Sequence, residues 1–214
     1  MCRLVVSLLC ALIGSLAAAQ EITRPAPAHA SGIDHTNVAV IINATDPLSV
    51  AAGEYYARAR RIPAPNVIRV RFPAGASELS VDEFRRVKAD VDASTPGGVQ
   101  AYALTWAAPY RVGCMSMTSA FAFGYDPSYC GSGCSPTRLS AYFDSASRAP
   151  ASELGVRPTM MLAGRSFSEI KALIDRGVES DGTYPRGTAY LLLTSDKARD
   201  SRVLMYPMVR SAAA

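Results

Sequence analysis

Histidine is nearly absent from this chain, whose 214 residues include only His29 and His35. Both precede or adjoin the amino end of the first predicted strand. Serine and cysteine hydrolases pair their nucleophile with a general base, most often a histidine. Because neither histidine falls at the carboxyl edge of the predicted sheet, the sequence disfavours a Ser-His-Asp triad. A Cys–His dyad would require the chain to fold back on itself.

Signatures of cofactors, metals and nucleic acids are missing as well. The first predicted strand is followed by Asn43-Ala-Thr-Asp-Pro47, which contains no glycine-rich phosphate loop, so we expect no nucleotide cofactor. No second Cys/His pair accompanies Cys130 and Cys134, which argues against a zinc site. The formal charge is +4 with scattered basic residues, and this pattern disfavours nucleic-acid binding.

Long apolar runs are absent except near the N-terminus. There, Met1-Cys-Arg3 precedes an apolar run from Leu4 to Leu16, and Ala17-Ala-Ala19 follows it. The run is roughly half of the ~20 residues needed to span a bilayer, and small residues end it, as in a cleavable signal peptide. We therefore predict a signal peptide at residues 1–19, export to the periplasm or the medium, and no membrane span in the mature chain.

The segment after the predicted signal is rich in Pro and Ala and shows no periodicity. We predict that residues 20–36 are a disordered leader. Residues 37–214 then leave about 180 residues, enough for one domain with a sizeable core.

Runs of apolar, β-branched residues predict the strands of a sheet. Val38-Ala-Val-Ile-Ile42 is continuous and apolar, which is typical of a parallel strand covered on both faces. Alternation of such runs with helical patterns predicts an α/β fold, a mostly parallel sheet of about four strands with flanking helices in three layers. After the third strand, we predict a long irregular loop over residues 109–158. The four predicted strands are residues 38–42, 67–72, 100–106 and 188–194.

Three predicted helices begin with capping signals. Asp46 precedes Pro47, which suits a first helical turn because no amide hydrogen is needed there. Ser80-Val-Asp-Glu83 and Ser166-Phe-Ser-Glu169 are capping boxes. The helix after Ser166 is predicted to stop at Gly177, because a glycine commonly occupies the position just past the last helical turn.

Polar and aromatic residues follow the predicted strands at their carboxyl ends, where open parallel sheets bind ligands. Asp46 and Asp196 are candidates for catalytic acids or bases. The alternative is that Asp46 is a helix cap and the others are solvated loop residues. The candidate ligand-binding residues at this edge are Asn43, Trp106, Tyr110, Arg111, Ser195 and Lys197.

Three cysteines remain once the predicted signal is removed: Cys114, Cys130 and Cys134. In an oxidising compartment an odd number predicts one disulfide with one free thiol, or an intermolecular link. Cys130 and Cys134 flank Gly-Ser-Gly, and we expect these two to pair. Cys114, shortly after the third strand and close to Arg111, is a candidate nucleophile, although a buried or disulfide-bonded Cys114 is favoured.

Short motifs spread from about Asn37 to Arg199 carry a resemblance. They are Val40-Ile-Ile-Asn43, Asp46-Pro47, Ser49, Glu54-Tyr-Tyr56, Arg60, Ile62-Pro63, Asn66-Val67, Thr105-Trp106, Pro109-Tyr-Arg111, Ser119-Ala-Phe-Ala-Phe-Gly124 and Ser195-Asp-Lys-Ala-Arg199. Together they resemble an uncharacterised family of exported proteins from bacteria that carry exosortase, a membrane transpeptidase proposed to sort surface proteins. The resemblance implies an envelope or extracellular setting and no assigned activity. Family members are longer, which leaves open whether this chain is C-terminally complete.

A fainter similarity links the chain to gingipain and caspase-like peptidases. Tyr55-Tyr56 followed by Arg60-Arg-Ile-Pro63 resembles the end of their first helix. Those enzymes place a histidine after one strand and a cysteine after the next. Here Pro109-Tyr-Arg111 and Ser195-Asp-Lys197 occupy these positions, so the resemblance implies the fold without the dyad.

Three hypotheses about function follow. The leading one is an exported envelope domain, associated by resemblance with surface-protein sorting, whose partners are unknown and are envelope proteins or polysaccharide. The second is a caspase-like hydrolase that uses Cys114 or the edge between Asp46 and Asp196. The third is a carbohydrate- or peptide-binding module, and its aromatic residues would be Trp106, Tyr110, Tyr125 and Tyr129.

Overall fold

The computed structural model describes residues 32–131, 135–183, 190–195 and 200–208. The predicted signal peptide and residues 20–31 of the predicted leader lie outside these residues, as do Cys134, Asp196 and Lys197. No helix in the described part of the chain is long and apolar enough to cross a membrane.

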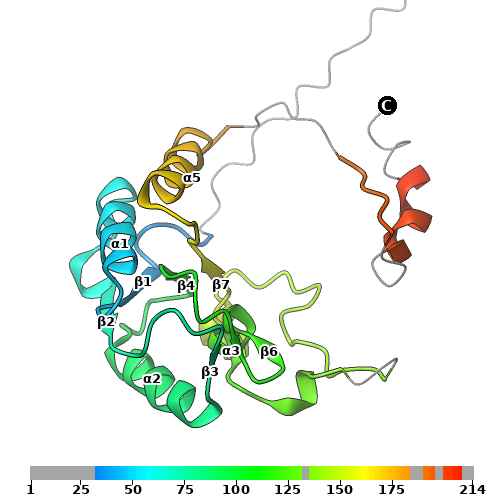
Figure 1. Cartoon of the computed structure of the whole chain (residues 1–214), viewed down its shortest axis with the longest axis horizontal. Helices are drawn as coiled ribbons and strands as arrows, with labels where there is room; N and C mark the ends of the chain where they lie inside the picture. The colour runs from blue at the N-terminus through cyan, green and yellow to red at the C-terminus, as the bar shows by residue number, and fades with distance from the viewer. Residues whose placement is uncertain (1–31, 132–134, 184–189, 196–199, 209–214) are drawn as a thin grey trace, which may run out of the picture. The chain divides into compact units, whose positions relative to one another are not determined.

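Four parallel strands form the main sheet, in the order β2-β1-β4-β7. They are β1 (Val38–Asn43), β2 (Val67–Val70), β4 (Ala101–Leu104) and β7 (Thr159–Met161). Helices α1 (Pro47–Ala59) and α5 (Phe167–Glu179) cover one face, and α2 (Val81–Ser94) and α3 (Met117–Phe123) cover the other (Figure 1). The predicted α/β fold with a mostly parallel sheet in three layers is confirmed.

Alternate residues of the strands fill two separate cores. Ile41 and Leu104 face α2 and α3, whereas Val40 and Ala103 face α1 and α5. Both sets are fully buried, because each face of the sheet is covered by helices. The core under α2 and α3 is the more aromatic, and Phe121 makes edge-to-face contacts there with three rings. These rings are Phe84, Tyr102 and Trp106, at centroid distances of 5.3, 6.4 and 5.9 Å.

The fourth strand differs from the prediction. Among the described residues the sheet ends with β7, which directly follows the stretch predicted as an irregular loop. In the predicted fourth strand, residues 188 and 189 lie outside the described residues, and Tyr190–Thr194 is not in a strand. A strand of three residues, Thr-Met-Met, is too short to produce a recognisable period in the sequence, which is why it was missed.

The predicted helix starts are confirmed, and one helix end is wrong. The Asp46 side chain accepts a hydrogen bond from the Leu48 N–H, and the Ser80 and Ser166 hydroxyls accept from the third residue of their helices. Helix α5 does not stop at Gly177 but runs to Glu179. A Cβ atom at Gly177 would lie 2.9 Å from Nη2 of Arg60, so this glycine makes room for the arginine of a neighbouring helix.

The stretch after β4 is partly organised by short elements. A small second sheet joins β3 (Glu78–Leu79), β5 (Arg111–Val112) and β6 (Met115–Ser116), in the order β3-β5-β6. Strands of two residues give no sequence signal, and this sheet was not predicted. The remaining short helices are η1 (Ala64–Asn66), η2 (Pro127–Tyr129), α4 (Pro150–Leu154) and η3 (Asp200–Met205).

Candidate functional site

Asn43 lies at the carboxyl end of β1 and is fully buried. Its Nδ2 donates to the Phe72 carbonyl at 3.0 Å, and its Oδ1 accepts from the backbone N–H and the hydroxyl of Thr45, at 3.1 and 2.8 Å. The backbone N–H of Asn43 donates to the Ser49 hydroxyl. Each polar group of this candidate ligand-binding residue therefore already has a protein partner, and Asn43 joins the loop after β1 to the end of β2.

Thr105 lies at the same edge of the sheet, just after β4, and connects β4 with β1 and α1. Its hydroxyl lies 2.9 Å from the Ser49 hydroxyl and 3.1 Å from the Ile41 carbonyl, which fastens the first turn of α1 to the end of β4. Behind this contact, a Cβ atom at Gly53 would come within 2.4 Å of Cγ1 of Ile42. Helix α1 is packed so closely on β1 that no ligand fits between them.

Trp106 lies under the carboxyl edge rather than on it. The indole is 1% exposed, its Nε1–H donates to the Pro109 carbonyl at 3.0 Å, and its ring meets Phe72 edge-to-face. The predicted contact between Trp106 and a ligand stays untested, but the burial of the ring argues against it. A buried indole with a satisfied N–H is a core residue.

The other candidates at this edge are placed on the surface or have structural roles. Tyr110 is exposed, and the exposed guanidinium of Arg111 pairs with Glu78 at 2.7 Å. Asp46 caps α1. Ser195 is exposed in a bend, and its predicted neighbours Asp196 and Lys197 lie outside the described residues. The structure thus brings Asn43 and Thr105 together through Ser49, but the described members of the predicted set do not form one site.

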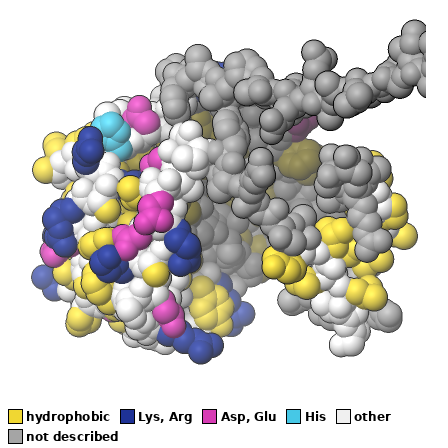
Figure 2. Space-filling model, turned by 90° about the horizontal axis from the view of Figure 1, so that it is seen from above, with side chains coloured by type: hydrophobic (Ala, Val, Ile, Leu, Met, Phe, Trp, Pro, Cys, Tyr) yellow, Lys and Arg dark blue, Asp and Glu magenta, His cyan; other side chains and the backbone are white. Residues whose placement is uncertain are grey.

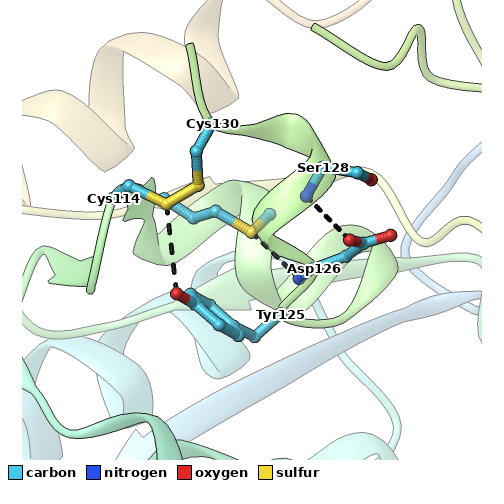
Figure 3. The surroundings of a disulfide bond; sticks show 6 residues. Cys114, Tyr125, Asp126, Ser128 and Cys130 are labelled. Atoms are coloured by element: carbon cyan, nitrogen blue, oxygen red, sulfur yellow. Dashed lines mark hydrogen bonds between the residues drawn. A yellow bond between two sulfur atoms is a disulfide. The ribbon is translucent and has the colours of Figure 1, made fainter. Parts of the chain in front are cut away.

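The disulfide joins Cys114 to Cys130, with Cα atoms 5.8 Å apart (Figure 3). This corrects the expected pairing of Cys130 with Cys134, whereas a disulfide-bonded Cys114 agrees with the favoured alternative for that residue. The β5–β6 turn and helix α3 return the chain over 16 residues to its starting point, which spacing along the sequence cannot reveal. A sulfur held in a disulfide is not a thiolate, so Cys114 is not a nucleophile in this state.

The disulfide stands beside a groove of about 260 Å³. The groove is formed by the end of α3, helix η2, the loop after it and α4. Its wall is mostly apolar or aromatic, with one acidic and one basic side chain. The lining residues are Phe123, Asp126, Tyr129, Arg138, Leu139, Ala141, Leu154, Gly155 and Val156.

Asp126 and Arg138 form the polar wall of this groove. The Asp126 carboxylate accepts from the Ser128 N–H at 2.8 Å and from Nη1 of Arg138 at 3.0 Å. The hydrogen bonds from Ser128 and, to a smaller extent, the Arg138 guanidinium lower the pKa of Asp126 below 3.8. Both partners stay partly open to solvent.

Tyr129 and Leu139 form the apolar part of the wall. The Tyr129 ring lies 4.5 Å from the Phe123 ring, and the Arg138 guanidinium lies 5.4 Å from the Tyr129 centroid. Leu139 is largely exposed. Such a groove can take an apolar side chain and offer a charged pair to polar groups next to it. Of these residues the sequence singled out Tyr129 alone, and the Asp126-Pro127 cap signal was available but was not used.

Comparison with known proteins does not assign the chain to a family. No protein-family model, curated protein or solved structure matches the chain. The resemblance to the exosortase-associated family therefore stays a prediction. Within the described residues, no three His, Cys, Asp or Glu side chains gather as a metal site would require.

Proposed function

We propose that this chain is an exported domain of the bacterial cell envelope that binds a peptide segment of another envelope protein. The groove beside the Cys114–Cys130 disulfide takes one apolar side chain of that segment. Three features support export: the signal-peptide pattern at residues 1–19, the disulfide, which suits an oxidising compartment, and the resemblance to exported proteins.

The groove is the observation that carries this proposal. Its volume of about 260 Å³ is smaller than the roughly 300–1,000 Å³ of pockets that enclose a small molecule, so it suits a single side chain. Leu139, Leu154 and Val156 supply aliphatic contacts. The Asp126 carboxylate and the Arg138 guanidinium stand where they can meet a backbone N–H and carbonyl beside the inserted side chain.

A peptide fits this wall better than a polysaccharide does. Sugar rings stack on open aromatic faces, whereas the Tyr129 ring is already in contact with Phe123 and Arg138. The indole of Trp106, the strongest aromatic candidate in the sequence, is buried. The groove leaves both polar and aliphatic surface accessible, which suits a peptide that places its backbone beside the charged pair and one apolar side chain against the aliphatic wall.

Selection from a library of random displayed peptides tests the proposal. The secreted protein, with its disulfide intact, is immobilised, and bound peptides are sequenced. We expect the selected peptides to share one large apolar residue. Binding of a selected peptide should weaken at least tenfold in Ala141→Trp, whose indole fills the groove.

Ala146→Trp is the matched control, since Ala146 is exposed in the same loop and does not line the groove. This variant should bind as the unchanged protein does. Equal binding by both variants, or selected peptides without an apolar residue, would contradict the proposal. Export is tested separately by sequencing the secreted protein, which should begin at Gln20.

A further inference from the structure

The two edges of the main sheet differ in chemistry. At one edge, β2 carries Arg69 and then the chain continues through Arg71, and both are exposed. Arg69 pairs with Glu54 of α1 at 3.0 Å. Charged side chains of this kind discourage a further strand from pairing with an edge. The opposite edge, β7, consists of Thr159-Met-Met161 and has no charged residue.

Strand β7 is paired on one side only among the described residues. On that side, the Tyr102 N–H donates to the Pro158 carbonyl and the Leu162 N–H donates to the Leu104 carbonyl. Because neighbouring residues of a strand direct their backbone groups to opposite sides, those of Thr159 and Met161 are directed away from β4. Met160 is 48% exposed, although its partner on β4, Ala103, is fully buried. The edge at β7 therefore has both backbone groups and apolar surface to offer.

An apolar segment of this chain has the matching chemistry. Tyr190-Leu-Leu-Leu193 is a continuous apolar run, the pattern of a strand covered on both faces. Tyr190, Leu192 and Leu193 are 81, 69 and 73% exposed. Figure 2 shows hydrophobic side chains gathered on this C-terminal part, whereas over α1 they are interspersed with charged ones. The Leu192 carbonyl accepts a hydrogen bond from the Tyr206 hydroxyl.

The chain between β7 and this segment can bring the segment to the free edge of β7. Helix α5 follows β7 and packs beside α1, where the Tyr55 hydroxyl donates to Asp175. Arg60, at the end of α1, forms an ion pair with Asp181. Since α1 ends at the amino edge of the sheet, Asp181 is held at that edge too. Eight residues separate Asp181 from Tyr190 and reach up to about 30 Å, ample for the roughly 10 Å between packed layers.

We propose that Tyr190–Leu193 pairs in parallel with the free edge of β7 as the fifth strand of the same sheet. The unit β7–α5–fifth strand is then a right-handed crossover like the others in the sheet. The pairing covers Met160, buries the exposed leucines and brings Ser195 to the carboxyl edge. It does not depend on the function proposed for the groove.

Hydrogen exchange of the full secreted chain, followed by mass spectrometry, tests this pairing. We expect the amides of residues 190–194 to exchange on the order of 100-fold more slowly than in an unstructured chain, since strand amides open rarely. Leu192→Pro removes one amide from the ladder, so it should accelerate exchange in residues 159–161 as well and leave β1 unchanged. Leu204→Pro, at another exposed leucine outside the segment, should leave residues 159–161 unchanged.

Fast exchange at residues 190–194 in the unchanged protein would overturn the proposal. So would slow exchange that occurs only in a dimer, as measured by light scattering, because the edge would then be occupied by a second copy. An effect of Leu204→Pro on β7 equal to that of Leu192→Pro would also overturn it.

Discussion

The carboxyl edge of the sheet and the groove beside the disulfide contain similar residue types in opposite circumstances. At the edge, the polar groups of Asn43 and Thr105 are buried and have partners from other parts of the chain. In the groove, Asp126 and Arg138 pair with each other and remain open to solvent beside exposed Leu139. The comparison teaches that a polar residue at a favourable position in a fold is available for binding only if its hydrogen bonds are not already used within the protein.

The largest effect on stability is expected at the carboxyl edge of the sheet, where the polar groups are buried and bonded to each other. Asn43→Ala leaves the backbone N–H groups of Thr45 and Phe72 without their acceptor, Oδ1 of Asn43, and we expect a loss of about 3 kcal/mol in the free energy of unfolding. Urea unfolding measures this loss. Tyr110→Phe, at the exposed position of the same edge, should change stability by less than about 0.5 kcal/mol. Equal effects of the two substitutions would mean that the edge is not a closed network.

The disulfide predicts the next largest effect. Cys114→Ser with Cys130→Ser should lower the free energy of unfolding by about 2–3 kcal/mol, since a bond across 16 residues restricts the unfolded chain. The same substitutions should weaken peptide binding, because the bond anchors the wall of the groove. Cys134→Ser is the control and should change neither property. A large effect of Cys134→Ser would show that Cys130 pairs with Cys134 instead.

Close packing of α1 predicts a smaller loss. Gly53→Ala places a methyl group against Ile42, and we expect a loss of about 1–2 kcal/mol even though alanine favours a helix. Gly98→Ala is matched to it, because nothing lies within 4 Å of a Cβ atom at Gly98. Thermal unfolding should separate the two variants by several degrees. A stabilised Gly53→Ala would show that α1 lies farther from β1 than described.

The smallest effect concerns acid pH at the groove. Asp126 has a lowered pKa in the folded protein, so its ionised form contributes stability above about pH 3.8, and this contribution is lost as the pH falls through the lowered value. A carboxyl titration by NMR should therefore show Asp126 with a midpoint below 3.8. Asp126→Asn should remove this titration and leave the other carboxyl groups unchanged. A midpoint at or above 3.8 would mean that Ser128 and Arg138 do not hold the carboxylate.

Local signals explain how much of the fold was predictable. Asp46, Ser80 and Ser166 cap their helices through bonds to residues two or three positions away, so the sequence alone identifies them. The long apolar strands are equally visible, because both faces of β1 and β4 are buried. Strand β7 is too short to show a period, and its place in the sheet depends on pairing with β4.

The candidate site was harder to predict because it depends on distant partners. The side-chain amide of Asn43 is bonded to Phe72, 29 residues away, and the contact of Ser49 with Thr105 spans 56 residues. The pairing of Cys114 with Cys130 likewise follows from the path of the chain through α3. The groove is built from irregular segments between Phe123 and Val156, where side chains follow no period.

A titration with N-acetyl-leucine methylamide, monitored by NMR of the protein's methyl groups, tests the central claim most directly. We expect saturable shifts of the Leu139, Leu154 and Val156 methyl groups with a dissociation constant on the order of 1 mM, as suits a ligand of this size. The Ala141→Trp variant should lose these shifts. Methyl groups at the carboxyl edge, such as those of Val70 and Leu104, should not move. Shifts at Val70 and Leu104, or none in the groove at saturating ligand, would contradict the assignment of the groove as the open site and the edge as the closed one.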